Sequence, residues 1–464
     1  MSTATLLLPP PQTSPQYSPR RRLLLVAYCF PPVGGAGVQR PVKWVKYLHR
    51  QGWDVTVLTP SNPSVPVIDE SLERETPVET AFIRPTTWEP SYQAKHKIAK
   101  NDDTLRSWTS WSKRLAGSLA RSAAKLMLQP DPQILWYHNA VRAATARLRE
   151  VPHDAILATA PPYTSFLIGA ALKQRFQLPL ILDYRDEWDL SSRYLENAQR
   201  DVWSSFVQEW MQRHVLSRAD AVVATTQAST DRLAERLQAL KSPAKTTCIY
   251  NGFDDDDFSS QHHHDETVPA KDPGVFRLVY TGTLWNLTSV APVVTAIEQL
   301  HARLPRMARK LEFVCVGRKT PEQQAILARL AATGCRLVNV DYCDHTTVIS
   351  WLYSADALSL LLSDVPGADR VVPAKLFEYL AARKDLLAVL PNGEAATLVN
   401  RCHPAGAIAP SDIEGITKWF VQRLTLGAAR GPDDTGNITE FSRERQTEHL
   451  MELLDQLTLP RQEH

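Results

Sequence analysis

A glycine-rich loop near the start of the chain is well suited to bind an anionic ligand. Its glycines are Gly34, Gly35 and Gly37, and it lies between the apolar run 23–27 and segment 42–48, whose apolar residues have helical spacing. Glycines let a ligand approach the bare backbone, and the free N–H groups and positive dipole end of a following helix attract negative charge. The loop therefore predicts a site for a phosphorylated or otherwise anionic substrate.

The loop fits a dinucleotide site poorly. It matches the G-x-G-x-x-G pattern only at Gly35 and Gly37, because Arg40 stands where the third glycine would be. The next strand candidate, 55–58, is followed by Thr59 rather than by the acidic residue that usually binds the ribose of a nicotinamide cofactor. A structural turn without a ligand is the alternative that the loop alone leaves open.

Short apolar strands and helical segments alternate along most of the chain. The sheet and helices that they form must position the glycine-rich loop. Strand candidates in the first part are 23–28, 55–59, 155–159, 178–183 and 221–225, and those in the second part are 276–281, 311–316, 336–340, 357–362 and 386–390. Apolar strands that alternate with helices are typical of parallel sheets buried on both faces. We expect an α/β fold with two doubly wound, Rossmann-like domains that face each other across a cleft.

The predicted boundaries follow changes in composition. Residues 1–22 are rich in Pro, Ser and Thr and are predicted to be a disordered tail. The first domain spans 23–258, with 61–149 partly an insertion, and a linker or loop at 259–274 leads to the second domain at 275–440. Residues 441–464 are predicted to form a helix that packs back on the first domain.

Composition restricts the class of protein. The chain has 464 residues, a formal net charge of +2 and 44% hydrophobic residues, which fits a globular protein of more than one domain and gives no reason to expect nucleic acid as a partner. No apolar run reaches the roughly 20 residues of a membrane span. The six cysteines are scattered without a Cys-x-x-Cys pair, so we expect them reduced and the protein cytoplasmic.

The order of several short motifs resembles the GT-B glycosyltransferases, in particular the large retaining group called family 4. The motifs are the Phe30-Pro31-Pro32 and glycine loop, Gly52-Trp53, Pro161-Pro162, Asp183-Tyr184-Arg185-Asp186, Tyr250-Asn251-Gly252-Phe253-Asp254, Tyr280-Thr281-Gly282-Thr283 and Pro373 through Ala381. The resemblance implies that the chain moves a sugar from a nucleotide-diphosphate sugar to an acceptor hydroxyl with retention. It implies no metal and no cofactor other than this co-substrate.

The resemblance also implies roles for individual residues. Glu378 would accept hydrogen bonds from ribose hydroxyls, and Lys375 would meet the diphosphate as a point charge; an acid favoured by a helix dipole and a surface lysine are the ordinary alternatives. Predicted donor-binding residues are Gly34, Gly35, Gly37, Gly282, Thr283, Arg318, Asp364, Arg370, Lys375, Leu376 and Glu378. Predicted catalytic residues are Asp186, Arg185 and Glu378, and predicted acceptor-binding residues are Arg40, Tyr163 and Asp183. A buried Asp–Arg pair that holds the loop is the alternative for Arg185 and Asp186.

Two departures from the family pattern concern the donor site. The family usually has a second glutamate eight positions before Glu378, and this chain has Arg370 there, so the donor sugar cannot be inferred. The loop after Gly282 lacks the Arg and Lys that commonly hold the donor phosphates. Arg318, Lys319 and Lys375 are candidates to replace them.

Residues 88–127 bear on the acceptor. Lys and Arg outnumber acidic residues there, and tryptophans are interleaved with them, a pattern that fits a helix on an anionic membrane surface. Many members of the resembling family act on lipid-linked acceptors. The acceptor of this chain is unknown, and a lipid-linked one is a candidate. The protein would then lie peripherally at the inner face of the cell membrane. A helix packed on the first domain is the alternative.

Two other classes of function stay open. A sugar-nucleotide epimerase of the same architecture would need acid/base groups in the cleft, for which His345 is a candidate. A catalytically weakened GT-B binding protein would explain the missing cationic pair.

Overall fold

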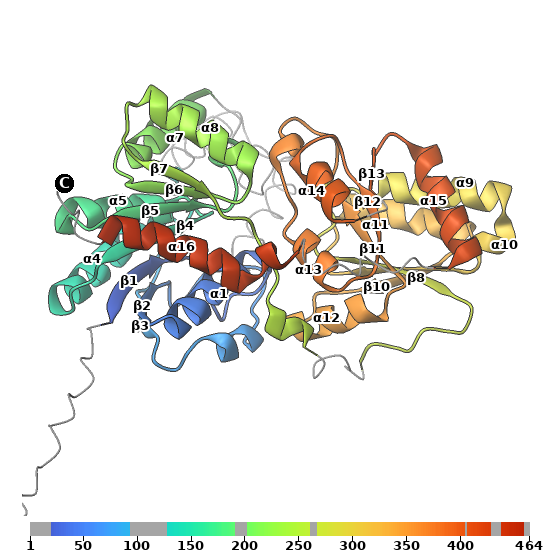
Figure 1. Cartoon of the computed structure of the whole chain (residues 1–464), viewed down its shortest axis with the longest axis horizontal. Coiled ribbons are helices and arrows are strands. Elements are labelled where there is room, and N and C mark those ends of the chain that lie inside the picture. The colour runs from blue at the N-terminus through green and yellow to red at the C-terminus, as the bar shows by residue number, and fades with distance from the viewer. Residues whose placement is uncertain are drawn as a thin grey trace, which may run out of the picture.

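Two parallel sheets with helices on both faces form the two lobes of the chain (Figure 1). The structure is a computed structural model and describes residues 20–92, 128–190, 202–259, 267–403, 406–427 and 438–458. Residues 1–19 of the predicted tail 1–22, most of the basic segment 88–127 and the histidines of the predicted linker lie outside the described residues, while Arg21 and Arg22 at the end of the predicted tail belong to a strand. None of the described helices combines the length and apolar character that crossing a membrane requires.

The first lobe contains a seven-stranded sheet in the order β3-β2-β1-β4-β5-β6-β7. Its strands are β1 (Arg21–Val26), β2 (Trp53–Leu58), β3 (Ala81–Ile83), β4 (Ala155–Ala160), β5 (Leu180–Tyr184), β6 (Ala221–Ala224) and β7 (Lys245–Cys248). Its helices are α1 (Ala36–Arg50), α4 (Ile134–Glu150), α5 (Thr164–Phe176), α7 (Val202–Leu216) and α8 (Gln227–Ala239), with the short 3-10 turns η1 (Ser71–Glu75) and η2 (Asp255–Phe258).

The second lobe contains a six-stranded sheet in the order β10-β9-β8-β11-β12-β13. Its strands are β8 (Phe276–Thr281), β9 (Leu311–Val316), β10 (Arg336–Val340), β11 (Ala357–Leu361), β12 (Asp385–Val389) and β13 (Ala407–Ile408). Its helices are α9 (Ala291–Arg303), α10 (Pro305–Ala308), α11 (Pro321–Ala328), α12 (His345–Ser354), α13 (Lys375–Ala381), α14 (Glu394–Cys402) and α15 (Ile413–Leu426), and α16 (Arg443–Thr458) follows.

The predicted fold class is confirmed, and the missed strands have a common physical cause. All strands pair in parallel, and the central ones are buried apolar runs. The missed strands β3, β7 and β13 lie at sheet edges and are only partly buried. An edge strand does not need a continuous apolar run, so its sequence carries little signal.

The chain crosses between the lobes twice, and the two crossings lie side by side. Phe253 N–H donates to Phe441 O at 3.1 Å, and Arg443 N–H donates to Phe253 O at 2.7 Å. A Cβ on Gly252 would lie 2.1 Å from Phe441 O, so only glycine allows this close approach. After the second crossing, α16 packs on α1 (Figure 1), and its residues Leu450 and Leu454 join the core beneath that helix.

A buried ion-pair network joins α1 to the first crossing. The Lys43 side chain is 1% exposed; its Nζ contacts Glu75 and lies 2.6 Å from Asp254 and 3.2 Å from Asp257. Burial would lower the pKa of Lys43, but the three carboxylates outweigh this and raise it. The network fixes the direction in which the chain leaves the first lobe.

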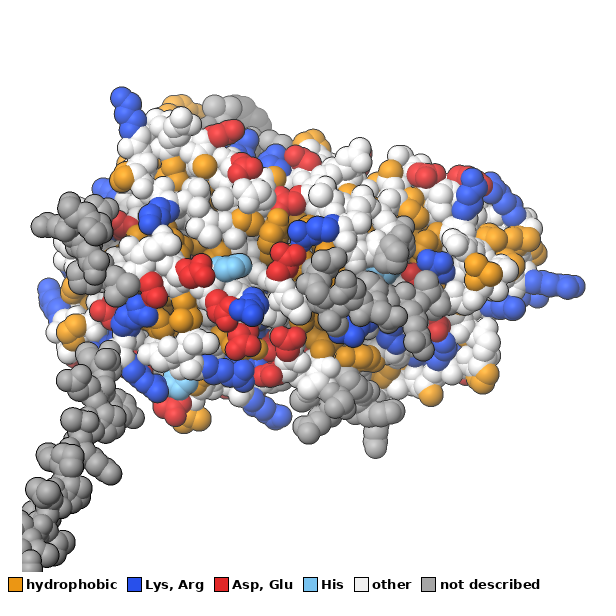
Figure 2. All heavy atoms as spheres, viewed as in Figure 1, with side chains coloured by type: hydrophobic (Ala, Val, Ile, Leu, Met, Phe, Trp, Pro, Cys, Tyr) orange, Lys and Arg blue, Asp and Glu red, His pale blue; other side chains and the backbone are white. Residues whose placement is uncertain are grey.

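The same helix makes two further contacts with the buried Asp254. Lys46 Nζ lies 2.6 Å from Asp254, and Tyr47 donates to the same carboxylate at 2.6 Å. Figure 2 shows acidic and basic side chains interspersed over α1 and α16 on this face. Three residues of the acidic run 254–257, namely Asp254, Asp256 and Asp257, are therefore paired with α1.

Replacing Lys43 by Met should destabilise the protein by about 3–5 kcal/mol, because it leaves buried carboxylates without their counter-charge. The free energy of unfolding from urea titrations measures the effect. Arg50→Met on the same helix is the matched control; its partner Asp256 is exposed, so that variant should lose less than about 1 kcal/mol. Equal losses in both variants would contradict a special role for the buried pair.

Candidate active site

A cavity of about 410 Å³ lies between the lobes, where the strands of both sheets end. This size is typical of ligand pockets. Ligands of open α/β sheets bind at the carboxyl ends of strands, beside the point where strand order reverses; here β1 lies between β2 and β4, and β8 lies between β9 and β11. Residues around the cavity include Gly35, Gln39 and Asp69 of the first lobe and Gly282, Thr283, Trp285, Lys375 and Glu378 of the second.

Only Gly35 of the three loop glycines lines the cavity. It has φ +101° and precedes α1, whose amino end has no side-chain cap. A Cβ on Gly34 would lie 2.7 Å from Val67 and 2.9 Å from the Tyr342 hydroxyl of the second lobe. Gly34 therefore allows the lobes to approach, while Gly35 presents backbone and the positive helix end to a ligand.

The turns after β8 and β9 also require glycine. Gly282 has φ +106°, and a Cβ there would lie 2.8 Å from Lys375 Nζ. Gly317 has φ +114°, and a Cβ there would lie 2.6 Å from Gly282 O. Two stacked turns thus form a wall of the cavity, and Gly282 and Thr283 expose their surface to it.

Lys375 and Glu378, both predicted for the donor site, come together on the first turn of α13. Lys375 Nζ donates to the Tyr280 hydroxyl at 2.7 Å and lies over the Tyr280 ring. Burial lowers the pKa of Lys375 to about 7, and the attraction of Glu378 only partly opposes this shift. Lys375 can therefore change its charge near neutral pH when an anion arrives.

Glu378 is paired with His345, the first residue of α12. The distance from His345 Nε2 to Glu378 Oε1 is 3.0 Å. Burial would lower the pKa of His345, but Glu378 and Asp257 outweigh it and raise the value to about 9. Burial would raise the pKa of Glu378, yet the hydrogen bond from His345 outweighs it and lowers the pKa. The pair is thus an imidazolium and a carboxylate at neutral pH.

The Arg185 side chain binds the glycine loop. Pro41 lies within α1 and has no N–H, so it cannot bond to the carbonyl four residues earlier, that of Gly37. Arg185 Nη1 donates to this Gly37 oxygen and Nη2 donates to Pro161 O. These contacts fit the alternative that Arg185 holds the loop; Arg185 also lines the second pocket described below, and its catalytic role stays a prediction.

Arg40 and Asp183, predicted to bind the acceptor, bind each other instead. Arg40 Nη2 lies 3.0 Å from Asp183 Oδ1, and the two side chains are 1% and 0% exposed. Arg40 also donates to Tyr250 O, and Thr159 donates to Asp183. The sequence analysis considered a buried Asp–Arg pair for Arg185 and Asp186; the buried pair in the structure joins Arg40 and Asp183 instead, and neither side chain is presented to an acceptor.

A second, narrower pocket adjoins the cavity and shares Trp285 and Leu287 with it. Asp186 lines this pocket, and its carbonyl accepts a bond from Tyr163 Oη at 2.9 Å. Tyr163 itself is buried and stacks on Trp188. Of the residues predicted for catalysis or the acceptor, Asp186 therefore lies exposed at this second pocket, and Glu378 lies at the cavity.

Arg370 crosses between the lobes in this second pocket. Its Nε and Nη2 lie 2.7 and 3.0 Å from the two carboxylate oxygens of Glu187 in the first lobe. The hydrogen bond to Glu187 outweighs burial and raises the pKa of Arg370. The arginine that replaces the family's glutamate therefore has an acidic partner on the opposite side of the cleft.

Besides Gly34, Gly37 and Arg370, the predicted donor residues Leu376, Arg318 and Asp364 do not line the cavity. The Leu376 side chain is 0% exposed and packs in the core of the second lobe. Arg318 and Asp364 are exposed outside the lining. Leu376 was included because it lies in a motif, and helix periodicity turns it inward.

Sequence reasoning missed several polar residues of the site. Glu187 directly follows Asp186, and its position beside a predicted cleft residue could have suggested it. Tyr342 donates to Asp69 of the first lobe at 2.9 Å, and Arg443 lines the cavity from the start of α16. These two residues have no local pattern that predicts their place.

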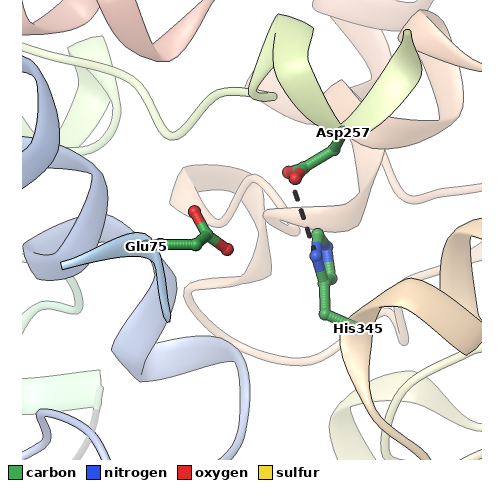
Figure 3. A group of neighbouring side chains, drawn as sticks. All are labelled: Glu75, Asp257 and His345. Carbon is green, nitrogen blue, oxygen red and sulfur yellow. Dashed lines mark ion pairs between the residues drawn. The ribbon is translucent and has the colours of Figure 1, made fainter. Parts of the chain in front are cut away.

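Glu75, Asp257 and His345 point toward a common space (Figure 3), and their oxygen and nitrogen atoms could hold a metal ion. Lys43, however, contacts Glu75 and lies 3.2 Å from Asp257. Its ammonium already supplies the positive charge that a metal ion would bring, so these residues fit an ion-pair network better than a metal site.

The chain resembles known proteins in its first half by sequence and over its length by fold. Residues 34–252 match the family model of the glycosyl transferase 4-like domain. No curated protein sequence matches the chain.

Three solved structures illustrate the similarity in fold. The Anabaena protein HepE, in complex with UDP and glucose, has a TM-score of 0.53 and 13% identity, with 94% of this chain and 95% of that chain covered. An E. coli trehalose-6-phosphate protein bound with UDP-2-fluoro glucose has a TM-score of 0.58 and 12% identity, with 94% and 99% covered. A UDP-forming trehalose-phosphate synthase from Burkholderia xenovorans has a TM-score of 0.60 and 12% identity, with 95% and 100% covered. These structures bear out the predicted GT-B fold, and the family match over residues 34–252 agrees with the predicted glycosyltransferase; the assignment to the retaining group stays a prediction.

Arg370→Glu should weaken the contact between the lobes, because it places a second carboxylate beside Glu187, whose side chain is only 6% exposed. We expect a loss on the order of 3 kcal/mol in the free energy of unfolding. The double variant Glu187→Arg/Arg370→Glu should recover at least half of it. Urea titrations of the single and double variants measure the coupling, and purely additive losses would contradict a direct pair.

Proposed function

We propose that this chain is a glycosyltransferase that moves a sugar from a nucleotide-diphosphate sugar to an acceptor hydroxyl with retention. The observation that carries the proposal is a single cavity in which Gly35 and the amino end of α1 lie on one side and Lys375 and Glu378 on the other. A helix end and a lysine suit a diphosphate, and a carboxylate suits ribose hydroxyls.

The ligands of the solved structures with a similar fold support a uridine nucleotide as the first donor to test. HepE is described with UDP and glucose, and the E. coli protein with UDP-2-fluoro glucose. At 12–13% identity these relatives share the fold with this chain, so the base and the sugar of its own donor are matters for experiment.

The leaving diphosphate sets the main chemical task. When the bond between the anomeric carbon and the diphosphate oxygen breaks, negative charge grows on that oxygen. Lys375, whose pKa is lowered to about 7 in the empty cavity, takes up a proton more readily beside this charge and stabilises it. Glu378, held by His345, would fix the ribose and so the position of the reacting bond.

Retention would follow if the acceptor attacks from the face that the diphosphate leaves. The acceptor oxygen then bonds to the anomeric carbon, and its proton passes to the departing diphosphate oxygen, so no protein nucleophile is required. Asp186 lines the adjoining pocket and would orient the acceptor hydroxyl by accepting a hydrogen bond.

We further propose that the acceptor is lipid-linked and that the protein works at the cytoplasmic face of a membrane. Trp203, Phe206 and Trp210 on α7 are 73%, 67% and 58% exposed. Their spacing places them on one helix face, as in a helix that inserts aromatic rings at a lipid interface. The basic composition of residues 88–127 in the sequence supports an anionic surface.

Purified protein should bind at least one of UDP, GDP, ADP and TDP in calorimetric titrations. Glu378→Ala should weaken that binding roughly 10- to 100-fold, because hydrogen bonds to a carboxylate are lost. Glu322→Ala in the first turn of α11, away from the cavity, is the matched control. Absence of binding to all four nucleotides would overturn the proposed function. Unchanged binding by Glu378→Ala would show that the ribose does not bind at Glu378.

Vesicles containing an anionic lipid should sediment the protein at low salt, and raised salt should weaken the association. A variant with Trp203, Phe206 and Trp210 all changed to Ser should sediment less, because the exposed aromatic face is removed. Equal sedimentation of this variant, or none of the wild type, would argue against membrane contact through α7.

A further inference from the structure

Arg443 is a buried cation without a counter-ion. The residue is 5% exposed, and its Nη1 atom is buried without a hydrogen-bond partner. Among the residues that the structure describes, no carboxylate forms an ion pair with it. Every other charged residue discussed at the cavity has a partner: Glu378 has His345, Asp69 has Tyr342, and Lys375 has Tyr280.

Such an arrangement is costly. Burial disfavours the charged guanidinium and lowers the pKa of Arg443 to about 10, with a further contribution from Arg40; the carboxylates of Glu378, Asp254 and Asp257, which form no ion pair with Arg443, oppose this shift only in part. The group nevertheless remains protonated at neutral pH. A buried charge that lacks a partner in the protein is expected where a ligand supplies the partner.

The location of Arg443 fits an anionic ligand. It lines the same cavity as Gly35, Gly282 and Lys375, and its backbone N–H is fixed to Phe253 O at the double crossing. This bond holds the backbone of Arg443 at the point where the chain crosses between the lobes. The loop 283–287 after β8, where the resembling family commonly places an Arg and a Lys, contains neither.

We propose that Arg443 binds the diphosphate of the nucleotide-sugar donor and, with Lys375, replaces the cationic pair that the β8 loop lacks. This inference rests on the proposed function, because it names a further residue of the same site. A planar guanidinium can donate two parallel hydrogen bonds to phosphate oxygens. Lys375 alone would be insufficient, since it is only partly charged near neutral pH in the empty cavity.

The test compares Arg443→Met with wild type in calorimetric titrations. The ligand is whichever of UDP, GDP, ADP and TDP binds wild type most tightly, and the corresponding nucleoside without phosphate is titrated in parallel. We expect Arg443→Met to bind the diphosphate roughly 10- to 100-fold more weakly and the nucleoside with unchanged affinity. Arg443→Lys should lie between, because it keeps the charge and loses the planar fork.

Arg445→Met is the matched control. Arg445 lies two residues further along α16, and its side chain is 63% exposed and pairs with Glu448, so the change should alter neither affinity. Thermal unfolding separates a structural role from a binding role. Removing an unpaired buried charge should leave the unfolding temperature of Arg443→Met unchanged or raise it, whereas a structural arginine would lower it.

The outcomes distinguish this inference from the proposed function. If wild type binds a nucleoside diphosphate and Arg443→Met binds it equally well, the role of Arg443 is wrong and the proposed function stands. An equal loss of diphosphate and nucleoside binding, together with a lowered unfolding temperature, would also overturn the role. If wild type binds none of the four diphosphates, the proposed function itself fails.

Discussion

The buried ammonium of Lys43 is the interaction on which the arrangement of the two lobes depends. It lies on α1, the helix that follows the glycine loop, and it binds carboxylates of η1 and of the first crossing. Asp257, one of these partners, lies 3.8 Å from His345, which in turn holds Glu378. A continuous series of charged contacts therefore runs from the helix that supports the anion loop to the carboxylate proposed for the ribose.

The lobes also meet through polar contacts on the other side of the cleft. Glu394 of α14 accepts hydrogen bonds from the N–H groups of Gln227 and Ala228 at the start of α8, at 2.7 and 2.8 Å. A carboxylate of one lobe thus satisfies the free donors at a helix end of the other. With the Glu187–Arg370 pair, this contact sets the width of the cleft beside the second pocket.

Features that depend on local sequence patterns could be predicted from the sequence. Contacts between residues that lie far apart in the sequence could not. Central strands and the α13 motif with Lys375 and Glu378 were found, because burial and helix starts leave a signal in neighbouring residues. The pairing of Arg40 with Asp183 was not, since 143 positions separate them and either residue alone resembles a site residue. The contact of Arg185 with Gly37 was likewise missed. It depends on Pro41, which leaves the Gly37 carbonyl without its helical donor, and on the packing of the loops that contain Gly37, Pro161 and Arg185.

The distribution of charge around the cavity explains both departures from the family pattern. Where the family has an acidic side chain toward the sugar, this chain has Arg370, and Glu187 neutralises it from the opposite lobe. Where the family has cations beside β8, this chain has uncharged residues, while α16 brings Arg443 into the cavity without a counter-ion. The charge of Arg370 is therefore balanced by an ion pair within the protein, whereas Arg443 has no ion-pair partner among the described residues. The positive charge left uncompensated therefore lies at the cavity, where an anionic ligand can balance it.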